Sequence, residues 1–145
     1  MKKIKGQNYL IIKQHLLILQ NLLMIKDLLL VGLGSGLGGM CRYLVSQLLV
    51  TTQNGFPWGT FTVNIVGSLL IGLLWGLSSR FPSLSPVLTL LFMVGFCGGF
   101  TTFSTFSREG LSLLQTQNYT LFLLYTLGSV VLGILAVMVG YFGGK

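Results

Sequence analysis

The stretch from Gly95 to Ser107 reads GFCGGFTTFSTFS. It lies in an apolar segment that is long enough to cross a membrane. The Gly98–Gly99 pair weakens a helix, and five hydroxyl side chains follow within seven residues. Interrupted backbone in hydrocarbon must be buried in protein or line a polar cavity, because lipid cannot bond to it. The stretch therefore predicts a break in the third span as a candidate functional site. The alternative is a glycine kink that only packs on neighbouring helices.

The composition is that of an integral membrane protein. Of the 145 residues, 52% are hydrophobic and 8% are charged, and Asp27 and Glu109 are the only acids. Soluble domains carry roughly 25% charged residues. A span needs about 20 apolar residues, so four spans nearly fill the chain. The net charge of +7 does not indicate nucleic-acid binding, because four of the nine basic residues lie near the N-terminus and the rest are dispersed.

We expect an all-α fold with a four-span domain over residues 25–145. The four transmembrane helices are expected at about residues 28–50, 59–77, 87–107 and 119–142. Residues 1–24 are an N-terminal extension with a basic start and an apolar run but no small-residue cleavage site. Two interpretations stay open. Residues 9–23 lie as an amphipathic helix on an anionic lipid surface, or the extension is read from an early start codon and the protein begins at Met24.

Polar side chains in the first two spans need an explanation. Thr60, Asn64 and Ser68 are four residues apart and share one helix face. An amide in a span is costly unless it finds partners, so Asn64 either joins helices or lines a polar path. Arg42 is either an anchor that snorkels to the interface or a residue that attracts anions to a vestibule.

The last two spans each carry a pattern on one face. Phe103 and Phe106 are three residues apart and share a face, which is usual for packing rings. Small or polar residues at helical spacing form a stripe suited to close packing, and these are Tyr125, Ser129, Gly133, Ala136 and Gly140. The hydroxyl groups in this stripe can also donate hydrogen bonds into a polar path.

Without the extension, the basic residues near the span ends are nearly balanced. Lys26, Arg80 and Lys145 lie on one side, and Arg108 lies on the other beside Glu109. Such residues set orientation, and so weak a bias permits insertion both ways up. This predicts an antiparallel (dual-topology) homodimer with a two-fold axis in the membrane plane. With the extension counted, the N-terminus is drawn inside, and dual topology is harder to explain.

A path with this lining suits a small anion. It has no acid that could bind a cation or relay a proton, and amide hydrogens, hydroxyl hydrogens and phenyl edges are electropositive. Conduction requires several weak sites. The break in the third span frees carbonyl oxygens. Two such breaks that cross at a two-fold axis would offer about four oxygens to a hard monovalent cation.

Three motifs match a known family. They are GGMCRY at 38–43, GTFTVN at 59–64 with GS at 67–68, and GFCGGFTTFSTFSRE at 95–109. Through these motifs the chain resembles, from about Met24 to Lys145, the Fluc (CrcB) family of small fluoride ion channels. The resemblance implies a dual-topology homodimer in the bilayer of the inner (plasma) membrane, with two antiparallel fluoride pores. It also implies a central structural sodium ion (Na+) on backbone carbonyls that map to Gly98 and Thr101.

The resemblance also maps the fluoride pathway onto this sequence. It maps Asn64, Phe103, Phe106, Tyr125 and Ser129 onto the pathway, and Thr60 falls near it. Arg42 is counted with them as the candidate vestibule residue. Asn64 is the pore amide, and the two phenylalanines present ring edges to fluoride. The next position of the polar track in the fourth span is Gly133, so a shorter track is expected. Glu109 falls near the same pathway.

These features predict passive export of fluoride, which protects a cell against fluoride toxicity. No ATP site, P-loop or enzyme constellation is present, so the protein is not expected to be an enzyme. The alternative is a small four-span drug or cation antiporter, which needs a carboxylate within the membrane, whereas Glu109 is expected at a span end. A third reading is a non-transporting subunit of a larger membrane complex.

Overall fold

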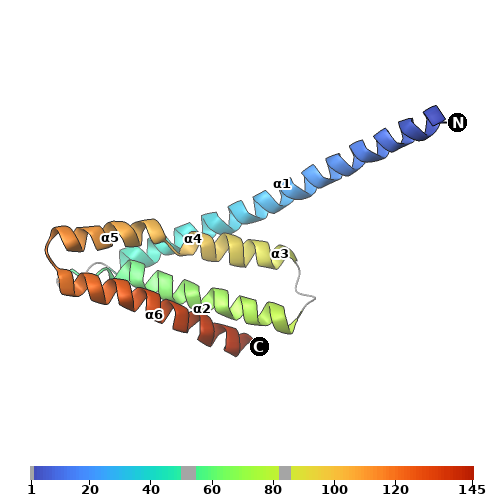
Figure 1. The fold of residues 1–145 in the computed structure, drawn as a ribbon. Helices are drawn as coiled ribbons and strands as arrows, with labels where there is room; N and C mark the ends of the chain where they lie inside the picture. The colour runs from blue at the N-terminus through green and yellow to red at the C-terminus, as the bar shows by residue number, and fades with distance from the viewer. Residues whose placement is uncertain (1, 50–54, 82–85) are drawn as a thin grey trace.

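The computed structural model describes residues 2–49, 55–81 and 86–145, and every element in these ranges is helical (Figure 1). Four stretches are long and apolar enough to cross a membrane, namely Ile12–Leu48, Trp58–Arg80, Pro86–Gln115 and Tyr119–Gly144. The shortest has 23 residues. At about 1.5 Å per residue it exceeds the hydrocarbon core of about 30 Å. The predicted all-α fold with four spans is confirmed, and the chain is a multi-pass integral membrane protein.

The helix bounds differ from the predicted spans mainly at the first and third. The elements are α1 (Lys2–Leu48), α2 (Trp58–Arg80), α3 (Pro86–Leu88), the π-helix η1 (Thr89–Cys97), α4 (Gly98–Phe100), α5 (Phe103–Gln115) and α6 (Tyr119–Gly144). α2 and α6 lie within a few residues of the predicted spans. α1 begins far earlier than expected, and α5 continues past residue 107 to Gln115. The predicted end of the first span at residue 50, and residues 51–54 and 82–85 of the loops, lie outside the described residues.

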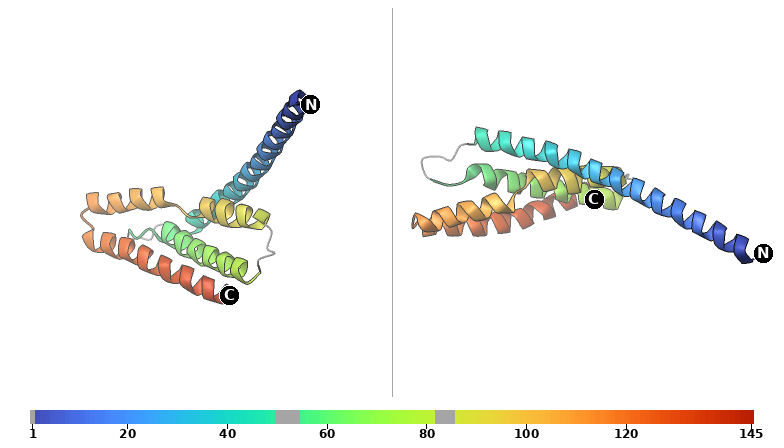
Figure 2. Two further views of the ribbon diagram at one scale, coloured as in Figure 1. Left: turned by 45° about the vertical axis from the view of Figure 1, so that its right-hand side comes forward. Right: turned by 90° about the horizontal axis from the view of Figure 1, so that it is seen from above.

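The bundle contains two closely packed helix pairs. α2 runs along α6, α1 packs on η1 and α4, and α5 lies beside α6 (Figures 1 and 2). Glycine allows these close approaches. A Cβ atom on Gly72 or Gly140 would overlap the backbone of the facing helix, and one on Gly34 or Gly38 would overlap the backbone of η1 or α4. The close packing predicted for the fourth span through small residues is confirmed at Gly140.

The outer surface of the bundle is apolar. The largest fully buried side chains are Val63 and Tyr125. By contrast, Leu33 in α1 is 63% exposed and Leu127 in α6 is 61% exposed. Such faces suit hydrocarbon rather than water as the surrounding medium. The early part of α1 projects beyond the bundle (Figure 2).

The third candidate span is not one regular α-helix. It starts with α3 and the π-helix η1. α4 ends at Phe100, after which Thr101 (φ −78°, ψ 159°) and Thr102 (φ −150°, ψ 120°) are extended. The Gly98–Gly99 pair is itself in a helical segment, with Gly98 at φ −63° and ψ −37°. The helical path is therefore left at the two threonines and not at the glycine pair.

The packing of α1 on η1 and α4 can be tested with two glycines of the same helix. Gly38 is buried against this backbone, whereas Gly36 is exposed with open space around it. Gly38→Leu should lower the thermal unfolding midpoint in detergent, because overpacking costs about 1–3 kcal/mol. Gly36→Leu should leave the midpoint near that of the parent. Equal losses in both variants would contradict the close approach of these helices.

Candidate functional site

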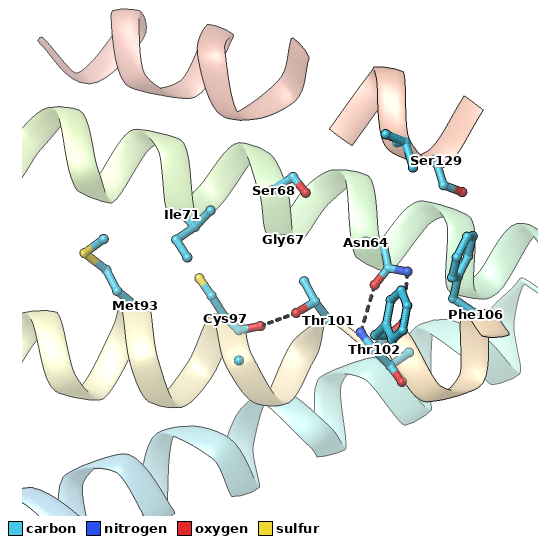
Figure 3. A pocket seen from close by; sticks show the side chains of 13 residues that line it. Asn64, Gly67, Ser68, Ile71, Met93, Cys97, Thr101, Thr102, Phe106 and Ser129 are labelled. Atoms are coloured by element: carbon cyan, nitrogen blue, oxygen red, sulfur yellow. Dashed lines mark hydrogen bonds between the residues drawn. The ribbon is translucent and has the colours of Figure 1, made fainter. Parts of the chain in front are cut away.

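An open groove of about 420 Å³ lies between α2, the third span and α6 (Figure 3). The described residues that line it include no Asp, Glu, Lys, Arg or His. They are Asn64, Gly67, Ser68, Ile71, Met93, Cys97, Gly98, Thr101, Thr102, Phe103, Phe106, Ser129 and Val130. Most of the lining is apolar, and the polar groups are neutral hydroxyls, one amide and backbone.

The amide of Asn64 holds the extended backbone at Thr102. The Thr102 N–H donates to Asn64 Oδ1 at 2.8 Å, and Asn64 Nδ2 donates to the Thr102 carbonyl at 3.2 Å (Figure 3). In a continuous helix, the Thr102 N–H would donate to the carbonyl of Gly98. Asn64 Oδ1 replaces the Gly98 carbonyl as the acceptor for the Thr102 N–H. The Gly98 carbonyl thus loses its helical donor. Asn64 Nδ2 carries two hydrogens, and its second N–H makes no hydrogen bond to a described residue.

Hydroxyl groups that follow the glycine pair also form hydrogen bonds with the backbone of the third span. Thr102 caps α5, since its Oγ1 accepts from the Thr105 N–H at 3.3 Å. The Thr102 hydroxyl also donates to Thr105 Oγ1 at 3.1 Å and lies 3.3 Å from Ser104 Oγ. The Thr101 hydroxyl donates to the Cys97 carbonyl at 2.9 Å. The Thr102 hydroxyl therefore gives an acceptor to an N–H at the start of α5, whereas the Thr101 hydroxyl adds a second hydrogen bond to the Cys97 carbonyl, which already accepts from the Thr101 N–H at 3.0 Å.

Two predicted ring residues line the groove together. The rings of Phe103 and Phe106 have centroids 5.8 Å apart at 37°. Phe103 is 80% exposed, whereas Phe106 is half-buried and its ring lies 5.0 Å from that of Tyr125. Phe103 thus offers a free ring at the mouth of the groove. Ser129 lies on the α6 side, and its Oγ is buried without a hydrogen-bond partner among the described residues.

Thr60 and Tyr125 belong to a second cluster around Glu109, outside the groove lining. Thr60 Oγ1 donates to Glu109 Oε1 at 3.0 Å, and the Tyr125 hydroxyl donates to Glu109 Oε2 at 2.8 Å. Arg108 Nη2 lies 4.0 Å from Glu109 Oε1. Thr60 and Tyr125 are buried, whereas the side chain of Glu109 is 21% exposed. The contact between Tyr125 and Phe106 links this cluster to the groove.

Arg42 is a predicted pathway residue that lies neither in the groove lining nor in the cluster around Glu109. It lies on α1, half-buried, and does not line the groove.

The structure also offers no conventional metal site, because the described residues contain no cluster of three His, Cys, Asp or Glu side chains. Backbone carbonyls are the available oxygen ligands for a hard cation. Gly98 is exposed and lines the groove with Thr101, so these two residues fit that requirement.

The pairing of Asn64 with Thr102 predicts a structural role that can be measured. Asn64→Ala leaves the Thr102 N–H and carbonyl without these partners, and an unsatisfied buried group costs about 1–3 kcal/mol. We expect a lower thermal unfolding midpoint in detergent. Ser68→Ala is the matched control, since Ser68 lines the same groove from the same helix. A parent-like midpoint for Asn64→Ala would contradict the stabilising role of the pairing.

Comparison with known proteins identifies the family of this chain. Residues 29–141 match the family described as CrcB-like protein, Camphor Resistance (CrcB). A protein of Phocaeicola vulgatus named fluoride-specific ion channel FluC is 50% identical over 112 residues, which are 77% of this chain and 92% of that protein. A protein of the same name from Bacteroides fragilis is 49% identical over 117 residues, covering 78% of this chain and 91% of the relative. The chain therefore belongs to the CrcB-like protein family.

Proposed function

We propose that this protein is a fluoride-selective channel that lets cytoplasmic fluoride leave passively and so protects the cell against fluoride toxicity. The observation that carries the proposal is a groove without charged side chains, lined by neutral hydrogen-bond donors and phenyl rings. The names of the two relatives support the same ion. In a bacterium such a multi-pass protein lies in the plasma membrane.

The lining of the groove favours a small anion for electrostatic reasons. The second N–H of Asn64 and the hydroxyl of Ser129 are hydrogen-bond donors available to a ligand. The edge of the Phe103 ring is electropositive. These groups can replace water around a small anion at several weak sites in succession, as conduction requires. A cation would meet the same hydrogens with repulsion.

The runner-up, a drug or cation antiporter, would have to use Glu109. α5 continues to Gln115, so this carboxylate lies within the candidate span Pro86–Gln115 rather than at its end. It already accepts hydrogen bonds from Thr60 and Tyr125 and does not line the groove. A carboxylate held in this way is poorly placed to bind a cation in the groove, which favours the fluoride channel.

The proposed channel is an antiparallel homodimer with a central structural sodium ion. One chain leaves the groove open and Phe103 80% exposed, which supports completion by a second copy. The extended step at Thr101 and Thr102 is proposed as the break at mid-membrane. Each copy would contribute the carbonyls of Gly98 and Thr101 to the sodium ion, whose role is to hold the two breaks together.

Fluoride efflux from liposomes tests the function. Vesicles that contain the protein and potassium fluoride receive valinomycin, and a fluoride electrode records efflux, with chloride-loaded vesicles as the control. We expect fluoride efflux to be much faster than chloride efflux. Proton-coupled uptake of an organic cation instead would support the antiporter. If neither activity occurs, the result favours a non-transporting subunit.

The same assay tests the ring at the mouth of the groove. Phe103→Ile should slow fluoride efflux on the order of tenfold, equivalent to about 1.4 kcal/mol in the barrier, because the electropositive ring edge is lost. The fold should persist, since Phe103 is exposed. Phe92→Ile is the matched control on the same span, because Phe92 is 42% exposed and lies outside the groove lining. Parent-like efflux in both variants would contradict the role of Phe103.

Removal of sodium tests the proposed cation site. A ligand that binds only the folded protein raises its stability, by about 2.7 kcal/mol at one hundred times its Kd. Protein purified throughout in N-methylglucamine should therefore unfold at a lower temperature than protein in sodium. Potassium at the same ionic strength separates a specific site from salt screening. Equal midpoints in all three cations would contradict a stabilising sodium ion.

A further inference from the structure

The carboxylate of Glu109 is bound at both of its oxygens by hydroxyl groups from other helices. Thr60 Oγ1 on α2 donates to Oε1 at 3.0 Å, and the Tyr125 hydroxyl on α6 donates to Oε2 at 2.8 Å. Thr60 is 4% exposed and Tyr125 is 0% exposed. Buried polar groups are held by their hydrogen bonds, so these two hydroxyls fix the position of the carboxylate.

The side chain of Tyr125 in turn depends on this carboxylate. A hydroxyl carries one hydrogen, and the buried Tyr125 hydroxyl gives it to Glu109 Oε2. A buried tyrosine hydroxyl needs such a partner. The Tyr125 ring also meets the ring of Phe56, with centroids 5.6 Å apart at 84°. The side chain is therefore held at its hydroxyl end by Glu109 and along its ring by aromatic contacts.

Phe106 packs on the ring that Glu109 holds. The centroids of the Phe106 and Tyr125 rings are 5.0 Å apart at 46°. Phe106 lines the groove and points from α5 towards α6 (Figure 3), whereas Tyr125 and Glu109 do not line the groove. Tyr125 thus forms the support behind a ring of the lining.

The contacts among these three residues form a closed set. Phe106 and Glu109 are three residues apart on α5, about one helical turn. Contacts therefore lead from Phe106 to Tyr125 on α6, from Tyr125 to Glu109, and back to α5. By contrast, Phe103 is 80% exposed and its ring contact is with Phe106. Of the two rings in the lining, Phe106 is the one whose orientation is set from behind.

A direct action of the Glu109 charge on an ion in the groove fits less well. Both oxygens of the carboxylate already accept hydrogen bonds, and the residue lies outside the lining. Side-chain contacts lead from Glu109 to the groove through Tyr125 and Phe106.

We propose that Glu109 is a positioning residue for the ion path. Its carboxylate holds the hydroxyl of Tyr125, and the Tyr125 ring then fixes the orientation in which Phe106 meets the anion. This assignment rests on the proposed fluoride channel.

Three substitutions separate the position of the carboxylate from its charge. Glu109→Gln removes the charge but keeps an acceptor for Tyr125, and its amide can donate to Thr60 Oγ1. Glu109→Ala removes both the charge and the acceptor. Tyr125→Phe removes the hydroxyl but keeps the ring and the charge. Tyr119→Phe is the matched control, because it removes an exposed hydroxyl from the same helix.

Fluorine NMR reads the placement of the ring directly. The full-length protein carries para-fluorophenylalanine at position 106 alone and is measured in chloride solution without fluoride. We expect Glu109→Gln and Tyr119→Phe to keep the parent resonance. Glu109→Ala and Tyr125→Phe should displace or broaden it, because the support behind the ring is released. A parent resonance in both of these last variants overturns the proposal.

Fluoride efflux from liposomes reads the consequence for conduction. Glu109→Ala and Tyr125→Phe should slow efflux about two- to tenfold, the range that one aromatic pair contributes. Glu109→Gln and Tyr119→Phe should keep the parent rate. Equal losses in Glu109→Gln and Glu109→Ala, or faster efflux in Glu109→Gln, would assign the effect to the charge and overturn the positioning role.

The design separates failure of this proposal from failure of the proposed function. Absence of fluoride efflux from parent vesicles contradicts the channel itself. Parent efflux rates in Glu109→Ala and Tyr125→Phe contradict the positioning role alone. If Glu109→Ala does not fold, Tyr125→Phe and Glu109→Gln decide by the same criteria.

Discussion

The structure depends on one constraint: where a helix is interrupted inside a membrane protein, the backbone N–H and C=O groups still need hydrogen-bond partners. Thr101 and Thr102 leave helical conformation inside an otherwise helical candidate span. Hydrocarbon offers no hydrogen bonds, so the partners must come from the protein. Asn64 supplies both a donor and an acceptor to Thr102, and the Thr102 hydroxyl accepts from the Thr105 N–H. The second helix thus bonds to the extended step beside the groove, and Asn64 and Thr102 both line the groove.

The same packing keeps the carboxylate of Glu109 out of the groove lining. The carboxylate of Glu109 is bound by hydroxyls from α2 and α6, which places it beyond Phe106 and away from the lining. The ring of Phe106 contacts Tyr125 on one side and lines the groove on the other. A lining without a negative charge is the electrostatic condition for an anion path. Glu109 thus ties three helices together from outside the groove lining.

Hydropathy and spacing were sufficient to predict the four spans and the shared face of Asn64 and Ser68. Spacing could not predict that the chain leaves the helix after Gly98–Gly99, because glycine tolerates helical geometry when packing supports it. The N-cap pattern of Thr102 and Thr105 was a signal for the true position. The partners of Glu109 could not be read from the sequence either, since they come from helices far apart along the chain.

In a single chain, groups that are exposed or lack a hydrogen-bond partner lie together along the groove. The exposed Gly98 and the half-buried Thr101 border the groove, as do the exposed Phe103 ring and the Ser129 hydroxyl, which has no partner among the described residues. A buried hydroxyl without a partner is costly in a medium of low dielectric constant. Lipid can cover the ring but cannot bond to a carbonyl or hydroxyl, so lipid alone does not satisfy this face. The proposed second copy, with the proposed ions, would supply both kinds of partner, so the conduction path and the assembly should be tested together.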